Sequence, residues 1–464
     1  MKPPSTGLLL AAALALPWPP PASASDEAFA EAARKVQKAL GEKDPGPLAD
    51  ALYGLREYDG EPAARTILSA AFRRETADFV LDAACDALRE MKSDEAAAVF
   101  VKETEKTRDA KRFLLLEALG RLKSPKAEEA LVAAAEDQDP RFRTAAVRAL
   151  ADRTAPTAAA RVAAERACVD PDPRVRSAAV AALTAWKGLP GALPLLGRLS
   201  VEKGRLYGDA WRGLRRISGK DLAPEPDTWA RWWRTQPGEE DWRYESAPAA
   251  PPPSVRGPGV VSFSRRVLFV LDTSDGMADK PGYRAEDLIP DDARKDGRDM
   301  EAWKGIQTRL DHARCQIVRM IRGLPADASF DVAFGAEAVG AVFRKMEPAT
   351  EAAKDRAIDR LGGLNAKLRQ DFLRLARAAF AAEPEGDPMD PRAFAEGADT
   401  VIYVGTALPS RGDETDPGRI AATVRRWNRV RQVQFFGIGV GTHGSGLLAD
   451  LASMPPVGGS AGIP

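Results

Sequence analysis

One short segment of the chain gathers residues that could hold a cation. Residues 266–277 read Arg-Val-Leu-Phe-Val-Leu-Asp-Thr-Ser-Asp-Gly-Met, an apolar run that ends at Asp272 and is followed two positions later by Ser274. Such a run predicts a buried β-strand, and open α/β sheets bind their ligands beyond the carboxyl ends of their strands. Carboxylate and hydroxyl oxygens are ligands that hard divalent cations such as Mg²⁺ prefer. The segment therefore points to an oxygen-rich site at the edge of a sheet.

The elements that must position this site are strands that alternate with helices. Strands are predicted over residues 267–271, 330–334, 341–343, 400–404 and 433–440. Helices are predicted over residues 310–324, 352–361, 368–381, 418–431 and 446–453. This alternation predicts an α/β doubly wound, Rossmann-like domain over residues 263–464, in which helices cover both faces of a mostly parallel sheet. Residues 278–303 form a charged insertion after the first of these strands.

Three motifs of this region resemble a von Willebrand factor type A domain. They are the Asp-Thr-Ser loop at Asp272, the Thr308-Arg-Leu-Asp-His-Ala-Arg start of a helix, and the strand end Phe436-Gly-Ile-Gly-Val-Gly. The resemblance covers about residues 263–455. It implies a metal-ion-dependent adhesion site, in which an Asp and two Ser, a Thr after Gly-Gly, and an Asp after the fourth strand surround a divalent cation. A ligand's carboxylate fills the open position.

Carried onto this chain, the family's ligand set is incomplete. Asp272 and Ser274 are present, but the second Ser is replaced by Gly276, the Thr by Leu364 and the last Asp by Thr406. One carboxylate then remains where the family brings two, and Mg²⁺ gives up its water reluctantly. We therefore expect no metal and no other cofactor, with Asp272, Ser274 and Thr406 as residual site candidates. Instead, Asp272 is expected to accept hydrogen bonds from N–H groups of its loop.

A cation site with substitute ligands stays open as an alternative. The residues close enough in sequence to replace the missing ligands are Asp275, Asn365, Asp279, Glu286, Asp287 and Asp291. The last four belong to the charged insertion. A Mg²⁺ or similar ion held in this way would make the domain a cation-dependent adhesion module.

The first half of the chain is built from helical repeats. Residues 137–150 match residues 170–183 at an offset of 33, and a closing leucine recurs at Leu55, Leu88, Leu119, Leu150, Leu183 and Leu214. In each of the two matching units, an Asp-Pro pair predicts a helix start, and apolar residues three to four positions apart predict one buried stripe. Helical hairpins of this kind bury their apolar faces by stacking. The pattern resembles short HEAT-like repeats, which implies an α-solenoid over residues 26–235.

The ends of this solenoid carry further signals. Trp229, Trp232 and Trp233 are expected to cap its last repeat, since terminal repeats must cover an exposed core; a carbohydrate or peptide platform is the alternative. Residues 236–262 form a linker whose Pro-rich part, residues 247–258, is predicted to be extended and unable to sustain helix or sheet pairing. Residues 1–24 read as a signal peptide, with a charged start, an apolar run and cleavage near Ala24. They predict export to the periplasm, the cell surface or the medium.

The remaining composition argues against several functions. Lys+Arg and Asp+Glu are equal at 67 each, so no overall field attracts nucleic acid, and no stretch approaches the ~20 apolar residues of a transmembrane helix. Cys85, Cys168 and Cys315 are widely spaced and predict neither disulfides nor a zinc site. His312 and His443 have no acid or nucleophile at motif spacing, so we expect no catalytic residue and no enzyme. A basic helix with Arg425, Arg426, Arg429 and Arg431 is interpreted as a solvated face.

These features predict an exported, non-enzymatic scaffold that binds protein partners. Its HEAT-like solenoid offers an extended concave surface, and its α/β domain carries a degenerate cation site. The alternatives are the cation-dependent adhesion module and, more distantly, an enzyme of unrecognised type acting at the insertion.

Overall fold

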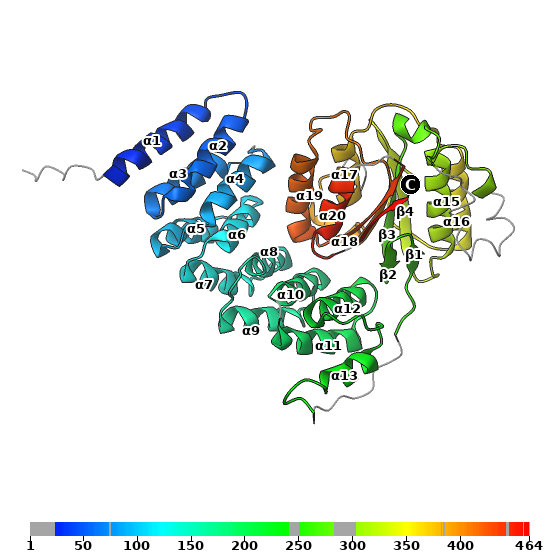
Figure 1. Ribbon diagram of the computed structural model, residues 1–464, viewed down its shortest axis with the longest axis horizontal. Coiled ribbons are helices and arrows are strands. Elements are labelled where there is room, and N and C mark those ends of the chain that lie inside the picture. Colours follow the sequence, from blue (N-terminus) through cyan, green and yellow to red (C-terminus); the bar gives the residue numbers. More distant parts are fainter. Residues whose placement is uncertain are drawn as a thin grey trace, which may run out of the picture.

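The protein consists of a curved array of helices and an α/β domain that lies within the curve (Figure 1). The computed structural model describes residues 24–73, 76–186, 188–240, 250–282, 303–381, 383, 386–441, 445–457 and 459–463. Nearly all of the predicted signal peptide and most of the charged insertion lie outside these residues. In the part of the chain that is described, no helix is long and apolar enough to cross a membrane.

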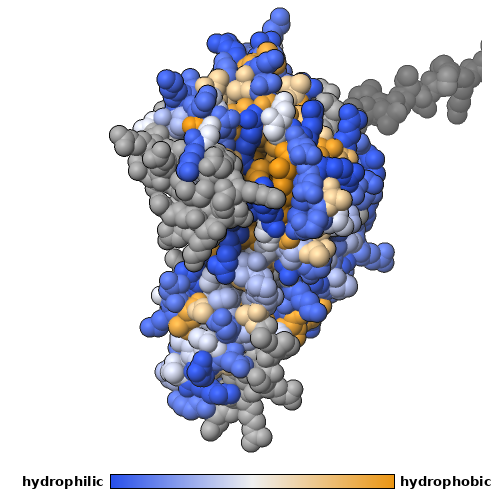
Figure 2. Space-filling view, turned by 90° about the vertical axis from the view of Figure 1, so that its right-hand side faces the viewer, coloured by the Kyte–Doolittle hydropathy of each residue, from blue (hydrophilic) through white to orange (hydrophobic). Residues whose placement is uncertain are grey.

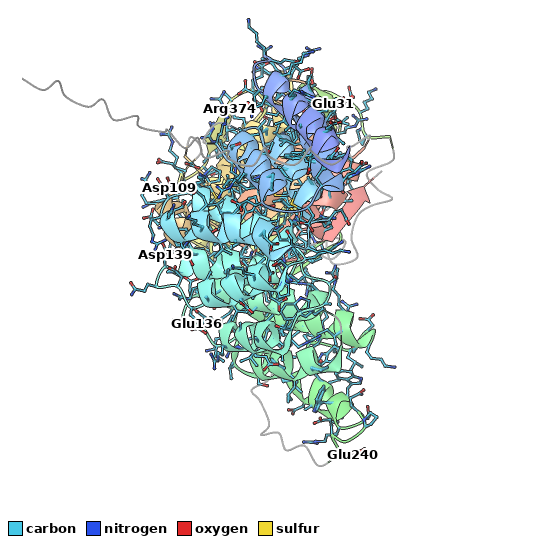
Figure 3. The ribbon with its side chains drawn as sticks, turned by 90° about the vertical axis from the view of Figure 1, so that its left-hand side faces the viewer. Glu31, Asp109, Glu136, Asp139, Glu240 and Arg374 are labelled. Carbon is cyan, nitrogen blue, oxygen red and sulfur yellow. The ribbon has the colours of Figure 1, made fainter. Side chains whose placement is uncertain are left out.

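The array is an α-solenoid of two helix layers. One layer contains α2 (Gly46–Gly54), α4 (Asp78–Leu88), α6 (Lys111–Arg121), α8 (Pro140–Leu150), α10 (Pro173–Ala185) and α12 (Arg205–Ser218). The other contains α1 (Ala24–Ala39), α3 (Glu61–Ala71), α5 (Asp94–Lys106), α7 (Pro125–Ala134), α9 (Ala158–Ala167) and α11 (Ala192–Val201), followed by α13 (Pro226–Trp233). Short 3₁₀ turns lie at Leu55–Glu57 and Leu189–Gly191. Figure 3 looks onto this array, with Glu31 near one end and Glu240 near the other.

The repeat motif acts as the sequence predicts. Asp139 and Asp172 cap α8 and α10 by accepting a hydrogen bond at 2.8 Å from the N–H groups of Arg141 and Arg174. The proline after each aspartate begins its helix, where the missing N–H costs nothing. All six closing leucines are buried in one continuous core. The prediction of a HEAT-like solenoid is confirmed.

Ion pairs tie each repeat to the next. An arginine in the first turn of an even-numbered helix reaches an acid that lies 25 to 27 residues later in the chain. The pairs are Arg112–Asp137 at 2.8 Å, Arg143–Asp170 at 2.8 Å and Arg176–Glu202 at 2.7 Å. Asp137 and Asp170 also accept hydrogen bonds from the N–H groups of the capping aspartates. The same motif therefore starts a helix and fixes its distance from the neighbouring repeat.

The tryptophans of α13 lie where the sequence places a cap. Trp229 and Trp233 are buried in the solenoid core, and Trp232 packs against it. The Trp229 indole donates a hydrogen bond to the carbonyl of Ala223 at 2.8 Å. The rings are thus engaged with the last repeat and do not form an exposed platform.

The α/β domain has a central sheet in the order β5-β4-β3-β7-β8-β9, with β6 pairing to β4. Its strands are β3 (Arg266–Asp272), β4 (Ser329–Gly335), β5 (Val339–Ala341), β6 (Glu347–Pro348), β7 (Thr400–Gly405), β8 (Gln434–Val440) and β9 (Gly459–Ile463). The β3, β4, β7, β8 and β9 strands are parallel, and the short β5 and β6 are antiparallel.

Helices and two separate cores cover the faces of this sheet. The helices are α15 (Arg309–Arg322), α16 (Glu351–Gly362), α17 (Phe372–Phe380), α18 (Pro391–Glu396), α19 (Pro417–Arg431) and α20 (Ser445–Ser453). One core contains side chains of α15 and α16, and the other contains those of α17, α19 and α20. The predicted α/β doubly wound fold is confirmed.

One prediction from sequence is wrong, and several short elements were not predicted. The segment 247–258 was expected not to pair in a sheet, yet β1 (Val255–Gly257) pairs antiparallel with β2 (Val260–Ser262). Gly259, in the left-handed region at φ 64°, allows the tight turn between them. Strands β6 and β9 and helix α18 were missed because they are short or lack a periodic apolar pattern.

Candidate functional site

The predicted site residues meet at the carboxyl ends of β3 and β7. These neighbouring parallel strands pair Leu271 with Val404, so Asp272 and the Gly405-Thr406 turn emerge side by side. A Cβ at position 405 would overlap the Cβ of Asp272. Glycine is therefore required there for the two loops to approach each other.

The Asp272 carboxylate is fully buried and accepts four hydrogen bonds from the protein. Its Oδ1 accepts from the Ser274 N–H at 2.8 Å. Its Oδ2 accepts from the Thr406 N–H at 3.0 Å, the Thr406 hydroxyl at 2.7 Å and the Tyr403 hydroxyl at 3.2 Å. Donors of the chain thus surround the oxygens that a cation would need.

Tyr403 and Gln370 extend this network beneath the loop. The Tyr403 hydroxyl accepts hydrogen bonds from the Gln370 amide at 2.8 Å and from the Ala407 N–H at 3.0 Å. Burial and the charge of Asp272 raise the pKa of Tyr403 well above its usual value. The phenol therefore keeps its proton and stays a hydrogen-bond donor to Asp272. Neither Tyr403 nor Gln370 was predicted as part of the site, although Tyr403 lies in a predicted strand.

Gly276 and Leu364 stand where the family has a Ser and a Thr ligand, and each has a different environment. Gly276 faces open space, with the Thr406 methyl 3.8 Å from where its Cβ would lie. Leu364 is buried in the core that contains α15 and α16, and its carbonyl accepts a hydrogen bond from Arg314. Backbone hydrogen bonds join the loops directly, from Asp275 N–H to Leu368 O at 2.7 Å and from Lys367 N–H to Thr273 O at 2.8 Å.

The substitute ligands are dispersed or already engaged. Asp275 and Asn365 are exposed, and Asp279 pairs with Arg309 at 2.9 Å. The Arg309 guanidinium also donates to the Gly276 carbonyl at 3.1 Å, which brings a positive charge to this loop. Glu286, Asp287 and Asp291 lie outside the described residues. Within the described ranges, no three His, Cys, Asp or Glu side chains are grouped as metal ligands.

The other residues considered for chemistry are buried or lie elsewhere. His312 is fully buried edge-on to Trp303, and burial lowers the pKa of its imidazole to about 4. Burial raises the pKa of the Cys85 and Cys168 thiols to about 12, and Cys85, Cys168 and Cys315 form no disulfide. His443 lies outside the described residues.

A second set of charged residues joins the two parts of the chain. The basic face of α19, predicted to be solvated, lies against α4, α6 and α8 (Figure 1), so that prediction is wrong for Arg426 and Arg429. It is also wrong for Arg431, which is buried and donates a hydrogen bond to the Phe380 carbonyl at 2.9 Å. Arg426 pairs with Asp78 at 2.7 Å, with Asp82 at 2.6 Å and with Glu117 at 2.6 Å. Arg429 pairs with Asp152 at 2.5 Å. Arg425, one position before Arg426, is exposed.

The carboxylates that receive these arginines follow a diagonal across the repeats. Asp82 lies six residues before the closing Leu88, Glu117 two before Leu119, and Asp152 two after Leu150. A step of four residues places Asp82 and Glu117 on the same helix face, one turn apart, and Asp152 follows in the turn just after α8. A single helix that crosses the layer obliquely can therefore meet all three. The progression is visible in the sequence, but the sequence does not show which helix meets it.

The charges at this interface depend on one another. Burial raises the pKa of Glu117, but Arg426, Arg429 and Arg121 outweigh it and leave the pKa lowered. The same balance at Asp152, with Arg429, Arg121 and Arg148, holds its pKa at about 2. At Asp82, burial outweighs Arg426 and raises the pKa.

The solenoid also covers the amino end of the sheet. Phe263, just before β3, packs edge-on against Tyr207 of α12 with ring centroids 5.2 Å apart. Arg212 of α12 donates to the Val261 carbonyl at 3.3 Å, and Gln434 at the start of β8 donates to Asp209 at 3.3 Å. The carboxyl ends of the strands, where Asp272 lies, point away from α12 (Figure 1). Figure 2, which views the molecule from the right-hand side of Figure 1, shows a mainly hydrophilic surface interrupted by a strip of hydrophobic side chains.

Comparisons with known proteins identify the repeats but not the whole chain. Residues 97–184 match the HEAT repeats family, and no curated protein matches the sequence. Three solved structures are similar to parts of the chain. One is an aerotolerance-related membrane protein from Bacteroides fragilis, with 14% identity and a TM-score of 0.25, which covers 38% of this chain and 66% of that chain. The second is a von Willebrand factor type A protein from Catenulispora acidiphila, with 18% identity and a TM-score of 0.27, which covers 44% of this chain and 40% of that chain. The third is an engineered protein, with 19% identity and a TM-score of 0.22, which covers 45% of this chain and 65% of that chain.

This chain therefore spans 40% to 66% of the length of those structures. The α/β architecture is assigned from the strand order and connections. The protein joins an α-solenoid, part of which matches the HEAT repeats family, to an α/β domain with a mostly parallel central sheet.

Replacing Asp272 by asparagine should destabilise the protein by about 2–3 kcal/mol, because the new amide nitrogen would face protein donors and leave one or more of them unpaired. Urea unfolding followed by circular dichroism measures the effect. Asp275→Asn is the matched control, since Asp275 is exposed and accepts from the adjacent Gly276 N–H. Equal stabilities of the two variants would show that Asp272 does not hold the loops together.

Removal of Arg426 should cost about 3–5 kcal/mol, because Arg426→Ala leaves Glu117 buried without its closest cation. Arg425→Ala, on the same helix, should change stability by less than about 0.5 kcal/mol. Urea unfolding of the full chain gives both values. Similar losses for the two variants would contradict the assignment of Arg426 to the interface.

The ion pair of Asp152 should make the free energy of unfolding depend on pH in the acid range. Because the pKa of Asp152 falls from 3.8 to about 2 on folding, its contribution is complete above pH 3.8 and is lost as pH falls toward 2. In Asp152→Asn the free energy of unfolding should therefore decline less between pH 4 and pH 2 than in the original chain. Unfolding titrations at pH 2, 3, 4 and 6 test this, and parallel pH profiles would refute it.

Proposed function

We propose that the protein is an exported, non-enzymatic scaffold that binds protein partners without a metal. The proposed division is the one predicted from the sequence: a HEAT-like solenoid over residues 26–235, a linker over 236–262 and an α/β domain over 263–464. The signal-peptide pattern of residues 1–24 supports export. Repeat solenoids present extended surfaces suited to protein partners, and that likeness supports a binding role.

The observation that carries metal independence is the state of the Asp272 carboxylate. Four hydrogen bonds from Ser274, Thr406 and Tyr403 occupy both of its oxygens. A cation would have to displace these donors and would find a single carboxylate in return. Since Mg²⁺ requires near-octahedral oxygen ligands and dehydrates reluctantly, the exchange is unfavourable. Thr406 thus stabilises Asp272 in the way that a bound cation otherwise would.

Among the described residues, no catalytic arrangement supports an enzyme. His312 is buried, and the two thiols at Cys85 and Cys168 are protonated at neutral pH because burial raises their pKa to about 12. The Asp272 carboxylate is likewise fully buried and hydrogen-bonded to four donors of the chain, so it is not exposed to a substrate.

Calorimetry of the full chain with Mg²⁺, Mn²⁺ and Ca²⁺ should give no saturable binding. A positive control is Gly276→Ser combined with Thr406→Asp, which adds a hydroxyl and a second carboxylate at the family's ligand positions and should bind Mn²⁺ measurably. Gly276 has space for the added side chain. One-to-one binding to the original chain that disappears in Asp272→Ala would instead establish the cation-dependent adhesion module.

A further inference from the structure

The concave face of the solenoid is occupied by the protein's own helix. Arg426 and Arg429, one turn apart on α19, enter the diagonal of carboxylates formed by Asp78, Asp82, Glu117 and Asp152. Each of these arginine side chains is at most 11% exposed. The surface expected to receive partners is therefore already bound in cis by an Arg-x-x-Arg helix.

We propose that this acidic diagonal, which we call the arginine cradle, is a binding site for helices that carry Arg-x-x-Arg. In this view α19 is its resident occupant, and a basic partner helix competes with it and separates the two domains. The inference rests on the proposed protein-binding function and names the chemistry of the partner.

Charge makes the cradle specific for such a helix. Arg121 of the solenoid lies 3.9 Å from both Glu117 and Asp152, whereas Arg426 and Arg429 approach the same carboxylates to 2.6 Å and 2.5 Å. Without α19, buried carboxylates would be left uncompensated, and that state is costly. Arginine fits because its guanidinium donates in several directions at once; Arg426 contacts three carboxylates within 2.7 Å. An empty cradle is therefore a strong acceptor for another arginine helix.

The contact with α19 is incomplete, which makes exchange feasible. Beside the ion pairs, a cavity of about 510 Å³ remains between α6 and α19. Phe113 and Leu114 line it from the solenoid, and Met389, Trp427 and Val430 line it from the α/β domain. Asp109, labelled in Figure 3, also belongs to its wall. A partner helix with the same two arginines and larger apolar side chains beside them could fill this space and bind more tightly than α19.

The test uses the full chain and a fluorescein-labelled peptide with the sequence of residues 417–431. Fluorescence anisotropy measures its binding to the original chain and to Arg426→Ala/Arg429→Ala, in which the resident arginines are removed. The peptide should bind the double variant at least about tenfold more tightly, because it no longer competes with two charged contacts. Arg425→Ala is the matched control and should bind like the original chain.

Two further comparisons assign the binding to the cradle. Adding Glu117→Gln and Asp152→Asn to the double variant should weaken the peptide at least about tenfold. A peptide in which alanine replaces Arg426 and Arg429 should show the same loss of affinity for the double variant. Equal binding to the original chain and the double variant, or no effect of the acid replacements, would overturn the proposal.

If the double variant does not fold by circular dichroism, Arg426→Lys/Arg429→Lys replaces it, since lysine keeps the charge but loses the multidentate contacts. The peptide should then bind this variant more tightly than the original chain, and equal binding would overturn the proposal. Failure here would leave the proposed metal independence standing, because cation calorimetry tests that part of the proposed function at a different site.

Discussion

The arrangement of the whole molecule depends on burying the guanidiniums of α19 against the carboxylates of the solenoid. Neither set of charges is tolerable alone in a buried position, and together they satisfy each other. Arg426 and Arg429 thereby fix which face of the α/β domain meets the repeats. Packing of Phe263 against Tyr207 and the hydrogen bond from Gln434 to Asp209 then set the second point of contact, at the amino end of the sheet. Two separated contacts hold the domain within the curve of the solenoid.

This placement explains why the Asp272 site and the arginine cradle differ in their suitability for binding a partner. The edge of the sheet that carries Asp272 points away from α12, yet the Asp272 carboxylate already accepts hydrogen bonds from the Thr406 and Tyr403 hydroxyls. The cradle is covered, yet its occupant is held through ion pairs beside an unfilled cavity. Interfaces between domains that rely on charge resemble transient protein interfaces more than cores. The covered surface is therefore the one better suited to exchange partners.

Sequence patterns predicted the elements more completely than the contacts between them. Periodicity found the buried leucines and the parallel strands β3, β4, β7 and β8, though not β9, since such patterns depend on local spacing. The loss of the cation ligands at Gly276, Leu364 and Thr406 was likewise visible as residue types. What the patterns could not give was the partner of each polar group: the role of Tyr403 depends on Gln370 and Asp272, 33 and 131 residues away. The basic helix was misjudged for the same reason, because its acids lie more than 270 residues earlier.

The arginine–acid motif serves two purposes in the solenoid, and their difference is informative. Pairs such as Arg143–Asp170 recur at nearly constant spacing and join neighbouring repeats, so they belong to the repeat itself. The acids at Asp82, Glu117 and Asp152 instead advance by four residues per repeat relative to the closing leucine, which repetition of identical units does not require. Their progression matches the path of one helix crossing several repeats. This diagonal therefore both stabilises the contact between the domains and selects the helix that fits it, which in this chain is α19.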